Sequence, residues 1–280
     1  MGEINTLHGF NKFTDQLEEQ DQLMPVLFVG HGSPMNGIED NEFSARWTKI
    51  ATEIPIPKAV LVVSAHWFTK GTHITAMDFP KTIHDFGGFP DELFKVQYPA
   101  PGNPALAAYT ASMIHSTSVG LSHDWGLDHG TWTVVRHMYP LATIPVLQLS
   151  IDYTKEAQYH YDLAKEIMAL RKKGVLIIGS GNMVHNLRMV AWDKLSESDY
   201  GYDWAIQMNQ TFKSLIINNT HDSLIHYAQL GKEAILAIPT PEHYLPLIYT
   251  LGLRDKNDTL SFFNDKAVGG SLTMTSVRLG

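Results

Sequence analysis

Short runs of consecutive apolar residues, each followed by glycine or by small and polar residues, recur along the chain. Four of them cover residues 26–29, 59–64, 144–149 and 175–178. Apolar runs of this length, bounded by turn residues, are typical of strands that are buried on both faces of a sheet. The pattern therefore predicts four buried strands of one central sheet.

Helical patterns fill the segments between these runs. The clearest predicted helices cover residues 41–54, 103–116, 131–139, 154–173 and 202–218, with a further helix at 244–251. Strands that alternate with helices favour a mainly parallel sheet with helices on both faces, so we predict a three-layer α/β fold. Residues 259–263 and 271–277 alternate like two further strands, which we expect at an antiparallel edge.

The chain divides into a short polar segment and one large domain. Residues 1–23 are polar and are predicted to form an N-terminal extension, with a short helix over residues 15–22. No repeat, low-complexity segment or linker interrupts residues 24–280. Because 280 residues suffice for one α/β domain with a substantial core, we expect residues 24–280 to be a single domain.

Composition restricts the partners and the metal ligands. The 29 acidic and 21 basic residues give a net charge of −8 without a basic patch, so neither nucleic acid nor an anionic membrane surface is an expected partner. The first residues form no basic or apolar leader, and no run of 18 apolar residues occurs, so we expect no membrane span and a cytoplasmic location. The chain has no cysteine, so any metal ion must be held by nitrogen and oxygen ligands.

Five histidines lie in short runs rich in Gly, Ser, Asn or Pro, next to predicted strand ends: His31, His66, His129, His185 and His243. Imidazole is the commonest protein metal ligand, and it exchanges protons near neutral pH. Side chains at the carboxyl ends of parallel strands point into the crevice where α/β proteins bind ligands. The pattern therefore predicts a metal site with acid/base histidines beside it.

The glycine-rich loop at residues 83–90 contains a sixth candidate, His84, and is expected to be either a pocket wall or a simple turn. Aromatic residues close to these motifs are candidates for the wall around a planar ring, with plain core packing as the alternative: Trp67, Phe86, Trp132 and Tyr244. The remaining histidines are expected at the surface or in helix caps: His8, His73, His115, His123, His137, His160, His221 and His226.

None of these motifs alone has the spacing of a known metal or nucleophile signature. The chain has no H-E-x-x-H and no G-x-S-x-G, and G-S-G-N at residues 179–182 lacks the lysine of a phosphate-binding loop. The residues by themselves therefore predict one metal ion in a histidine-rich site, with spare imidazoles for proton transfer.

Seven motifs in order along the chain carry a more specific resemblance. They are G-H-G-S-P-M (30–35), V-S-A-H-W (63–67), I-H-D-F-G-G-F-P (83–90), Y-P-A-P-G (98–102), D-H-G-T-W (128–132), G-S-G-N-M-V-H-N-L (179–187) and P-T-P-E-H-Y-L-P (239–246). Together they resemble the class III, LigB-type extradiol ring-cleaving dioxygenases, in particular the 4,5-DOPA dioxygenase-like branch. Residues 24–280 are accordingly expected to form an extradiol dioxygenase-like catalytic domain.

The resemblance implies a metal centre. In the wider family, Fe(II) is held by two histidines and one carboxylate, which leaves open positions on the metal. His31 and His66 match the two histidines, and the third position falls on His243, so this branch departs from the carboxylate pattern. Fe(II) is expected for activity, while a three-histidine site also suits Zn(II) as the resident metal.

The resemblance also implies the reaction. His129 and His185 match imidazoles that handle protons beside the metal, and His185 becomes a fourth ligand if zinc closes the site. The expected substrates are dioxygen and a small, DOPA-like catechol. Cleavage at the 4,5 position would give a muconic semialdehyde-type product.

Two other functions stay open from the sequence. One is a non-enzymatic metal-binding scaffold of the same superfamily, which would have no need of both His129 and His185. The other is a zinc-dependent hydrolase, which requires a carboxylate base near the metal, a role for which Glu242 and Asp128 are the candidates. Only the dioxygenase consumes oxygen, so assays with and without air separate it from the other two.

Overall fold

The structure is a computed structural model of the chain, and it describes residue 19 and residues 22–280. The predicted N-terminal extension at residues 1–23, with its short helix and His8, lies almost entirely outside the described residues and stays a prediction. Among the described residues, no helix is both long enough and apolar enough to cross a membrane.

Four adjacent parallel strands form the centre of the sheet, and they confirm the four predicted runs. They are β1 (Val26–Gly30), β2 (Ala59–Thr69), β5 (Val146–Asp152) and β6 (Val175–Gly181). β6 lies between β1 and β2, and β5 pairs with the other edge of β2. Their continuous burial explains why the sequence shows unbroken apolar runs rather than alternation.

Shorter strands of both directions extend this centre on each side. They are β3 (Thr72–Thr75), β4 (Val119–Ser122), β7 (Leu260–Phe263) and β10 (Ser276–Leu279). The order across the eight-stranded sheet is β4-β3-β5-β2-β6-β1-β10-β7. β10 is antiparallel to both β1 and β7, which confirms the predicted antiparallel edge. Residues 271–277 do not form one strand, because β9 (Leu272–Thr273) pairs separately with β8 (Ala267–Val268).

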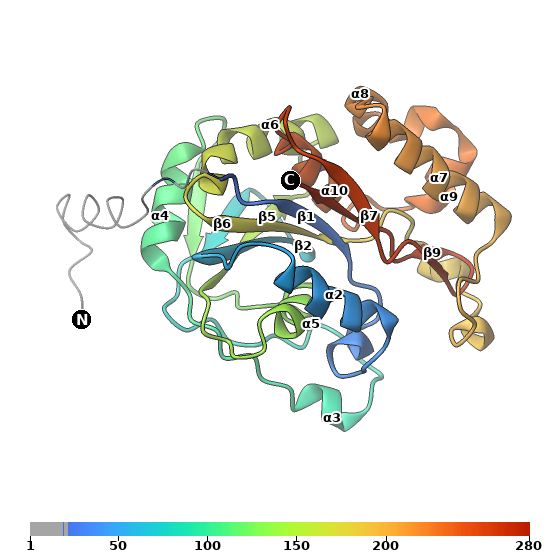
Figure 1. The fold of residues 1–280 in the computed structure, drawn as a ribbon, viewed down its shortest axis with the longest axis horizontal. Helices are drawn as coiled ribbons and strands as arrows, with labels where there is room; N and C mark the ends of the chain where they lie inside the picture. The colour runs from blue at the N-terminus through green and yellow to red at the C-terminus, as the bar shows by residue number, and fades with distance from the viewer. Residues whose placement is uncertain (1–18, 20–21) are drawn as a thin grey trace.

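Helices cover both faces of the sheet, as predicted (Figure 1). On one face lie α2 (Glu42–Thr52) and α5 (His129–Met138), with the short α3 (Asp91–Phe94) beside them. On the other lie α4 (Pro104–Met113), α6 (Ala157–Glu166) and α10 (Leu245–Gly252). Alternate residues of β1 belong to the two opposite cores, since Val26 and Phe28 pack in one cluster and Leu27 and Val29 in the other.

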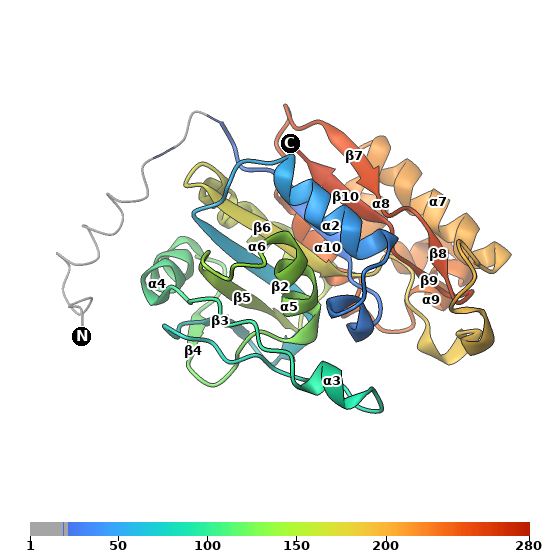
Figure 2. The ribbon, with the colours of Figure 1, turned by 60° about the horizontal axis from the view of Figure 1, so that its bottom comes forward.

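Three further helices form a group beside the β10–β7 edge (Figure 2). They are α7 (Asp203–Ile217), α8 (His221–Ile225) and α9 (Lys232–Ala237), and α7 contacts both of the others. Short 3-10 turns occur at Pro34–Gly37, Met168–Arg171, Leu187–Met189, Trp192–Lys194 and Tyr227–Leu230. The predicted helix at 154–173 is therefore two elements, and the tighter second one ends on Arg171, whose buried guanidinium pairs with Asp258.

Two sequence expectations about strand ends are corrected. His66 lies inside β2 rather than after it, because the pairing with β5 shifts register between Val63 and Phe68 and lets the strand continue. The G-S-G run is the end of β6 rather than a turn. Glycine is required at Gly181, since a Cβ there would lie 2.1 Å from the backbone oxygen of His243.

Two of the histidines expected at the surface or in caps are buried in the core. His160 is fully buried, and its Nδ1 lies 3.0 Å from the hydroxyl of Tyr249. His221 is 9% exposed, and its Nδ1 lies 2.8 Å from the hydroxyl of Tyr161. Both expectations were wrong because α6 and α8 turn these side chains toward neighbouring helices, where a tyrosine hydroxyl compensates for the lost water.

Candidate metal centre

The structure brings together all five of the histidines that the sequence singled out. His31 directly follows β1, His66 lies on β2, and His185 comes four residues after β6. His129 is the first residue of α5, and His243 lies two residues before α10. Because β1, β6 and β2 are adjacent and parallel, their carboxyl ends meet at one edge of the sheet, where α/β proteins bind ligands.

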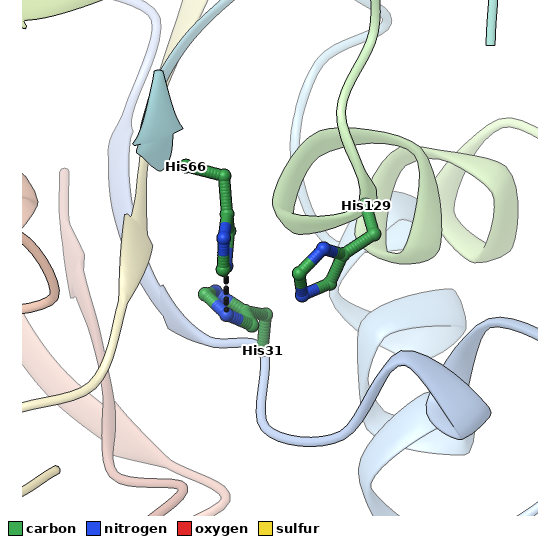
Figure 3. A group of neighbouring side chains, drawn as sticks. All are labelled: His31, His66 and His129. Carbon is green, nitrogen blue, oxygen red and sulfur yellow. Dashed lines mark hydrogen bonds between the residues drawn. The ribbon is translucent and has the colours of Figure 1, made fainter. Parts of the chain in front are cut away.

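The tightest group consists of His31, His66 and His129, which point toward one another (Figure 3). One ring nitrogen of each lies within 4.8 Å of those of the others, a spacing that can hold a metal ion. The Nε2 atoms of His31 and His66 are 3.0 Å apart. His31 is 1% exposed and His129 5%, so water has little access to their rings.

The remaining two imidazoles complete the cluster on its other side. The ring of His243 lies 5.3 Å from that of His31 and 5.0 Å from that of His66. His185 is half-buried and stacks on His243, with ring centroids 3.6 Å apart. The buried Nδ1 of His243 has no hydrogen-bond partner among the described residues, and the Oε1 of Glu242 is 3.5 Å away.

A serine fixes the proton on the ring of His31. The hydroxyl of Ser180 donates to the carbonyl of Gly130 at 2.5 Å, and a carbonyl can only accept. With its proton used, the Ser180 oxygen accepts from the Nδ1 of His31, 3.0 Å away. His31 therefore carries its proton on Nδ1, and the lone pair on Nε2 faces His66 and the centre.

Asp85 is the residue that the sequence reasoning missed. Its Oδ2 lies 2.9 Å from the Nδ1 of His129 and 3.3 Å from the Nδ1 of His66, and its Oδ1 accepts the backbone N–H of His129 at 2.9 Å. A signal was present, since Asp85 is the acidic residue of the glycine-rich 83–90 loop. The residue of this loop predicted from the sequence was His84. Its Nε2 hydrogen-bonds to the carbonyl of Val96, and its ring does not join the cluster.

The aromatic candidates divide into one wall residue and three core residues. Phe86 lies 5.5 Å from the ring of His129 and therefore lines the cluster. Trp132 is fully buried and donates to the carbonyl of Ile83. The other two also pack in the interior: Trp67, stacked on Trp125, and Tyr244, bonded to the carbonyl of Leu224.

The family can now be decided by comparison with known proteins. The family profile described as "Catalytic LigB subunit of aromatic ring-opening dioxygenase" matches residues 25–274. The chain belongs to the LigB family. It is 45% identical over 261 residues to the "4,5-DOPA dioxygenase extradiol" of Escherichia coli (strain K12), covering 92% of this chain and 95% of that protein.

Further relatives of this LigB-family chain agree. The "4,5-DOPA dioxygenase extradiol" of Beta vulgaris is 32% identical over 265 residues, covering 92% of this chain and 97% of that protein. A crystal structure of an uncharacterized protein from Escherichia coli K12 superposes with a TM-score of 0.77 at 40% identity, covering 92% of this chain and 100% of that one. The predictions of the α/β fold and of an extradiol aromatic ring-opening dioxygenase are confirmed.

Burial keeps four imidazoles of this LigB-family site neutral: His31, His66, His185 and His243. Burial, helped by the neighbouring imidazoles, lowers the pKa of His31 and of His243 well below the usual 6.5. Burial lowers the pKa of His66 to about 3 and that of His185 to about 4. Burial opposes ionisation of Asp85, but hydrogen bonds from His129 and the nearby imidazoles outweigh it and lower the pKa of this carboxyl.

The donor set fits a divalent metal ion. With Nδ1 of His31 protonated toward Ser180, the Nε2 lone pair of His31 faces the Nε2 of His66 at 3.0 Å, a hydrogen-bond distance (Figure 3). When His66 carries its proton on Nδ1, toward Asp85 at 3.3 Å, both Nε2 atoms can face one cation. Two nitrogens that are each about 2.1 Å from one metal, at a right angle, are about 3.0 Å from each other, so the observed distance suits two adjacent ligands.

The two carboxylates considered for a hydrolase have other partners. Asp128 is fully buried and accepts from Ser64, from Gln148 and from the backbone at the start of α5. Burial raises the pKa of Asp128 to about 6. Glu242 accepts from the hydroxyl of Thr240 and lies beside His243. Asp128 therefore caps α5 rather than facing the cluster as a free base.

Proposed function

We propose that residues 24–280 form a catalytic domain that inserts dioxygen into a small, DOPA-like catechol by 4,5-cleavage, giving a muconic semialdehyde-type product. The observation that carries this proposal is the convergence of five imidazoles at the carboxyl ends of β1, β2 and β6, with three ring nitrogens within 4.8 Å. The names of two relatives, which specify 4,5-DOPA, support the substrate class. A cytoplasmic location remains a prediction from the sequence.

We assign the metal to His31, His66 and His243, with Fe(II) as the active metal and Zn(II) as an alternative resident ion. The Nε2 atoms of His31 and His66 face each other at 3.0 Å. His243 is assigned as the third ligand because its ring lies within 5.3 Å of both and because no hydrogen bond to its buried Nδ1 fixes the tautomer. A divalent metal held by these residues would supply a Lewis acid for the catechol oxygens and a redox centre for the reaction with dioxygen.

His129 and His185 are proposed as the acid/base residues. The Nδ1 of His129 donates to Asp85, so its Nε2 carries the lone pair that accepts a phenolic proton. Phe86, beside His129, supplies an apolar wall for the aromatic ring and helps exclude water. His185, stacked on His243, is proposed as the second residue that donates or accepts a proton. It is also the residue that would become a fourth ligand for zinc.

The test is aerobic incubation of Fe(II)-reconstituted protein with a panel of catechols, with growth of a yellow semialdehyde chromophore as the readout. The panel includes DOPA, dopamine, protocatechuate and 4-methylcatechol. Anaerobic samples are the control, since cleavage requires oxygen. If no catechol yields a chromophore after iron loading has been verified, the catechol assignment fails; product formed equally without oxygen would exclude a dioxygenase.

A further inference from the structure

We propose that Asp85 is a positioning residue that sets the tautomer of two imidazoles at once, the ligand His66 and the acid/base residue His129. Metal binding by His66 and proton transfer by His129 would then both depend on one carboxylate, which the 83–90 loop positions. The inference rests on the proposed function, and it deepens it by assigning a residue that touches neither substrate nor metal.

The contacts of Asp85 use both of its oxygens. Oδ1 accepts the backbone N–H of His129, which anchors the carboxylate at the start of α5. Oδ2 is then shared by two rings, at 2.9 Å from the Nδ1 of His129 and 3.3 Å from the Nδ1 of His66. An ionised carboxylate only accepts hydrogen bonds, so the hydrogen bond from His129 holds the proton of that ring on Nδ1. At the longer distance the same negative charge favours the proton of His66 on Nδ1, which leaves the Nε2 of both rings for the metal or the substrate.

No other described carboxylate bonds to either ring. The second carboxylate nearby, Asp128, is bonded to Gln148 and Ser64 and fixes the backbone of α5 instead. Ser180 accepts from the Nδ1 of His31 and so fixes the tautomer of that ring, the role that we propose for Asp85 toward His66 and His129. Three of the five imidazoles are thus oriented by only two side chains, and Asp85 serves two of them.

The loop that carries Asp85 is firmly attached on one side. The backbone N–H of Ile83 bonds the carbonyl of Leu127 at 2.7 Å, and the indole of Trp132 bonds the carbonyl of Ile83 at 2.9 Å. Both anchors lie in or just before α5, the helix that begins with His129. Asp85 and its neighbour Phe86 therefore contact His129 from an anchored loop. The same loop places both the carboxylate that orients the imidazole and the apolar side chain proposed to contact the substrate ring.

Asp85→Asn is the sharpest variant because it keeps shape and removes one acceptor. The amide oxygen must still accept the backbone N–H of His129, so the NH₂ group faces the two rings. That group donates, which forces Nδ1 to accept and moves the ring proton to Nε2, where it opposes a metal. Asp85→Glu keeps the acceptor and is the conservative variant. Asp91→Asn, an exposed residue six positions later, is the matched control for the charge change.

Zn(II) affinity is measured by chelator competition, and kcat and KM with 4-methylcatechol after Fe(II) loading. Loss of a carboxylate that orients a metal-binding histidine typically costs about 10–100-fold in affinity or activity. We expect Asp85→Asn to show that loss in Zn(II) affinity and in kcat with little change in KM, Asp85→Glu to recover part of both, and Asp91→Asn to match wild type. Wild-type affinity and kcat in Asp85→Asn, or an equal loss in Asp91→Asn, would overturn the proposal.

A measurement on the wild type guards against misfolding of the variants. In the Zn(II)-loaded protein, ¹⁵N NMR of the imidazoles should show His66 and His129 protonated on Nδ1, and protonation of His129 on Nε2 would overturn the proposal. Neither the affinity nor the NMR result needs turnover. A wild type that binds zinc but cleaves no catechol would therefore refute the proposed function while the role of Asp85 is still decided.

Discussion

The two halves of the imidazole cluster differ in what holds the ring nitrogen that faces away from the centre. In the anchored half (His31, His66 and His129), each Nδ1 has an oxygen of Ser180 or Asp85 within 3.3 Å. In the open half (His185 and His243), the Nδ1 of His243 has no hydrogen-bond partner among the described residues, and Glu242 is 3.5 Å away.

This difference shows which part of the centre is preorganised. A ring whose tautomer and orientation are already fixed loses little freedom when it binds a ligand, so His31 and His66 of the anchored half would bind a metal ion without rearrangement. A ring without such a partner has no hydrogen bond that fixes which nitrogen carries the proton. The choice between three and four histidine ligands, and with it the choice between an open iron site and a closed zinc site, therefore belongs to the open half.

Removal of His31 should have the largest effect. His31→Ala deletes one of the two opposed Nε2 donors, and we expect its metal content after loading and gel filtration to fall to background, with complete loss of catechol cleavage. Elemental analysis measures the metal. His226→Ala, at an exposed histidine, is the control. Stoichiometric metal in His31→Ala would show that the anchored half does not provide the primary ligands.

His129 and His185 separate proton transfer from metal binding. Loss of a positioned acid or base typically costs about 10²–10⁴-fold in rate. We expect His129→Ala and His185→Ala to lose activity in this range while both keep near-stoichiometric metal, in contrast to His243→Ala, which should lose it. A His129→Ala protein that loses its metal while His243→Ala retains it would exchange the two roles, since His129 also lies within coordination range.

Outside the cluster, a buried histidine should affect stability and not catalysis. Burial lowers the pKa of His160 from 6.5 to about 4. Because the unfolded chain binds a proton that the folded chain resists, stability from this group is complete above pH 6.5 and declines as the pH falls toward 4. Between pH 6.5 and pH 4, this group lowers the free energy of unfolding by about 3 kcal/mol in all. Urea unfolding at pH 7.5 and pH 5 measures the free energy of unfolding, which should fall less between these pH values in His160→Gln than in wild type. The control His226→Gln should behave as wild type. An equal fall in all three proteins would assign the pH dependence to other groups.

Local pattern was enough to predict the centre of the fold. The strands β1, β2, β5 and β6 are buried on both faces, so their apolar runs are unbroken and easily recognised. β3 and β4 were not predicted because they are short and carry polar or half-exposed residues. The five histidines were found because each lies in a short run rich in Gly, Ser, Asn or Pro near the end of a strand or the start of a helix, and these runs meet at one edge of the sheet.

Contacts between distant residues could not be predicted in the same way. Asp85 is 44 positions from His129, and only the folded 83–90 loop brings them together. His160 had a usable local signal, since it lies on the buried face of α6 with Leu163 and Ala164, three and four residues later. A polar residue on an apolar helical face was interpreted as exposed, although a partner such as Tyr249 allows it to be buried.

The smallest expected effect tests the difference between the two halves directly. Glu242→Gln removes the charge beside His243, as Asp85→Asn does beside His129, but at 3.5 Å and on a half-exposed side chain. Because no hydrogen bond is lost from the ring, Zn(II) affinity should change by less than about fivefold, against the 10–100-fold typical of an orienting carboxylate. Chelator competition on both variants in parallel measures the contrast. An equal loss in the two would mean that Glu242 orients His243 as firmly as Asp85 orients His129, and that the open half is preorganised as well.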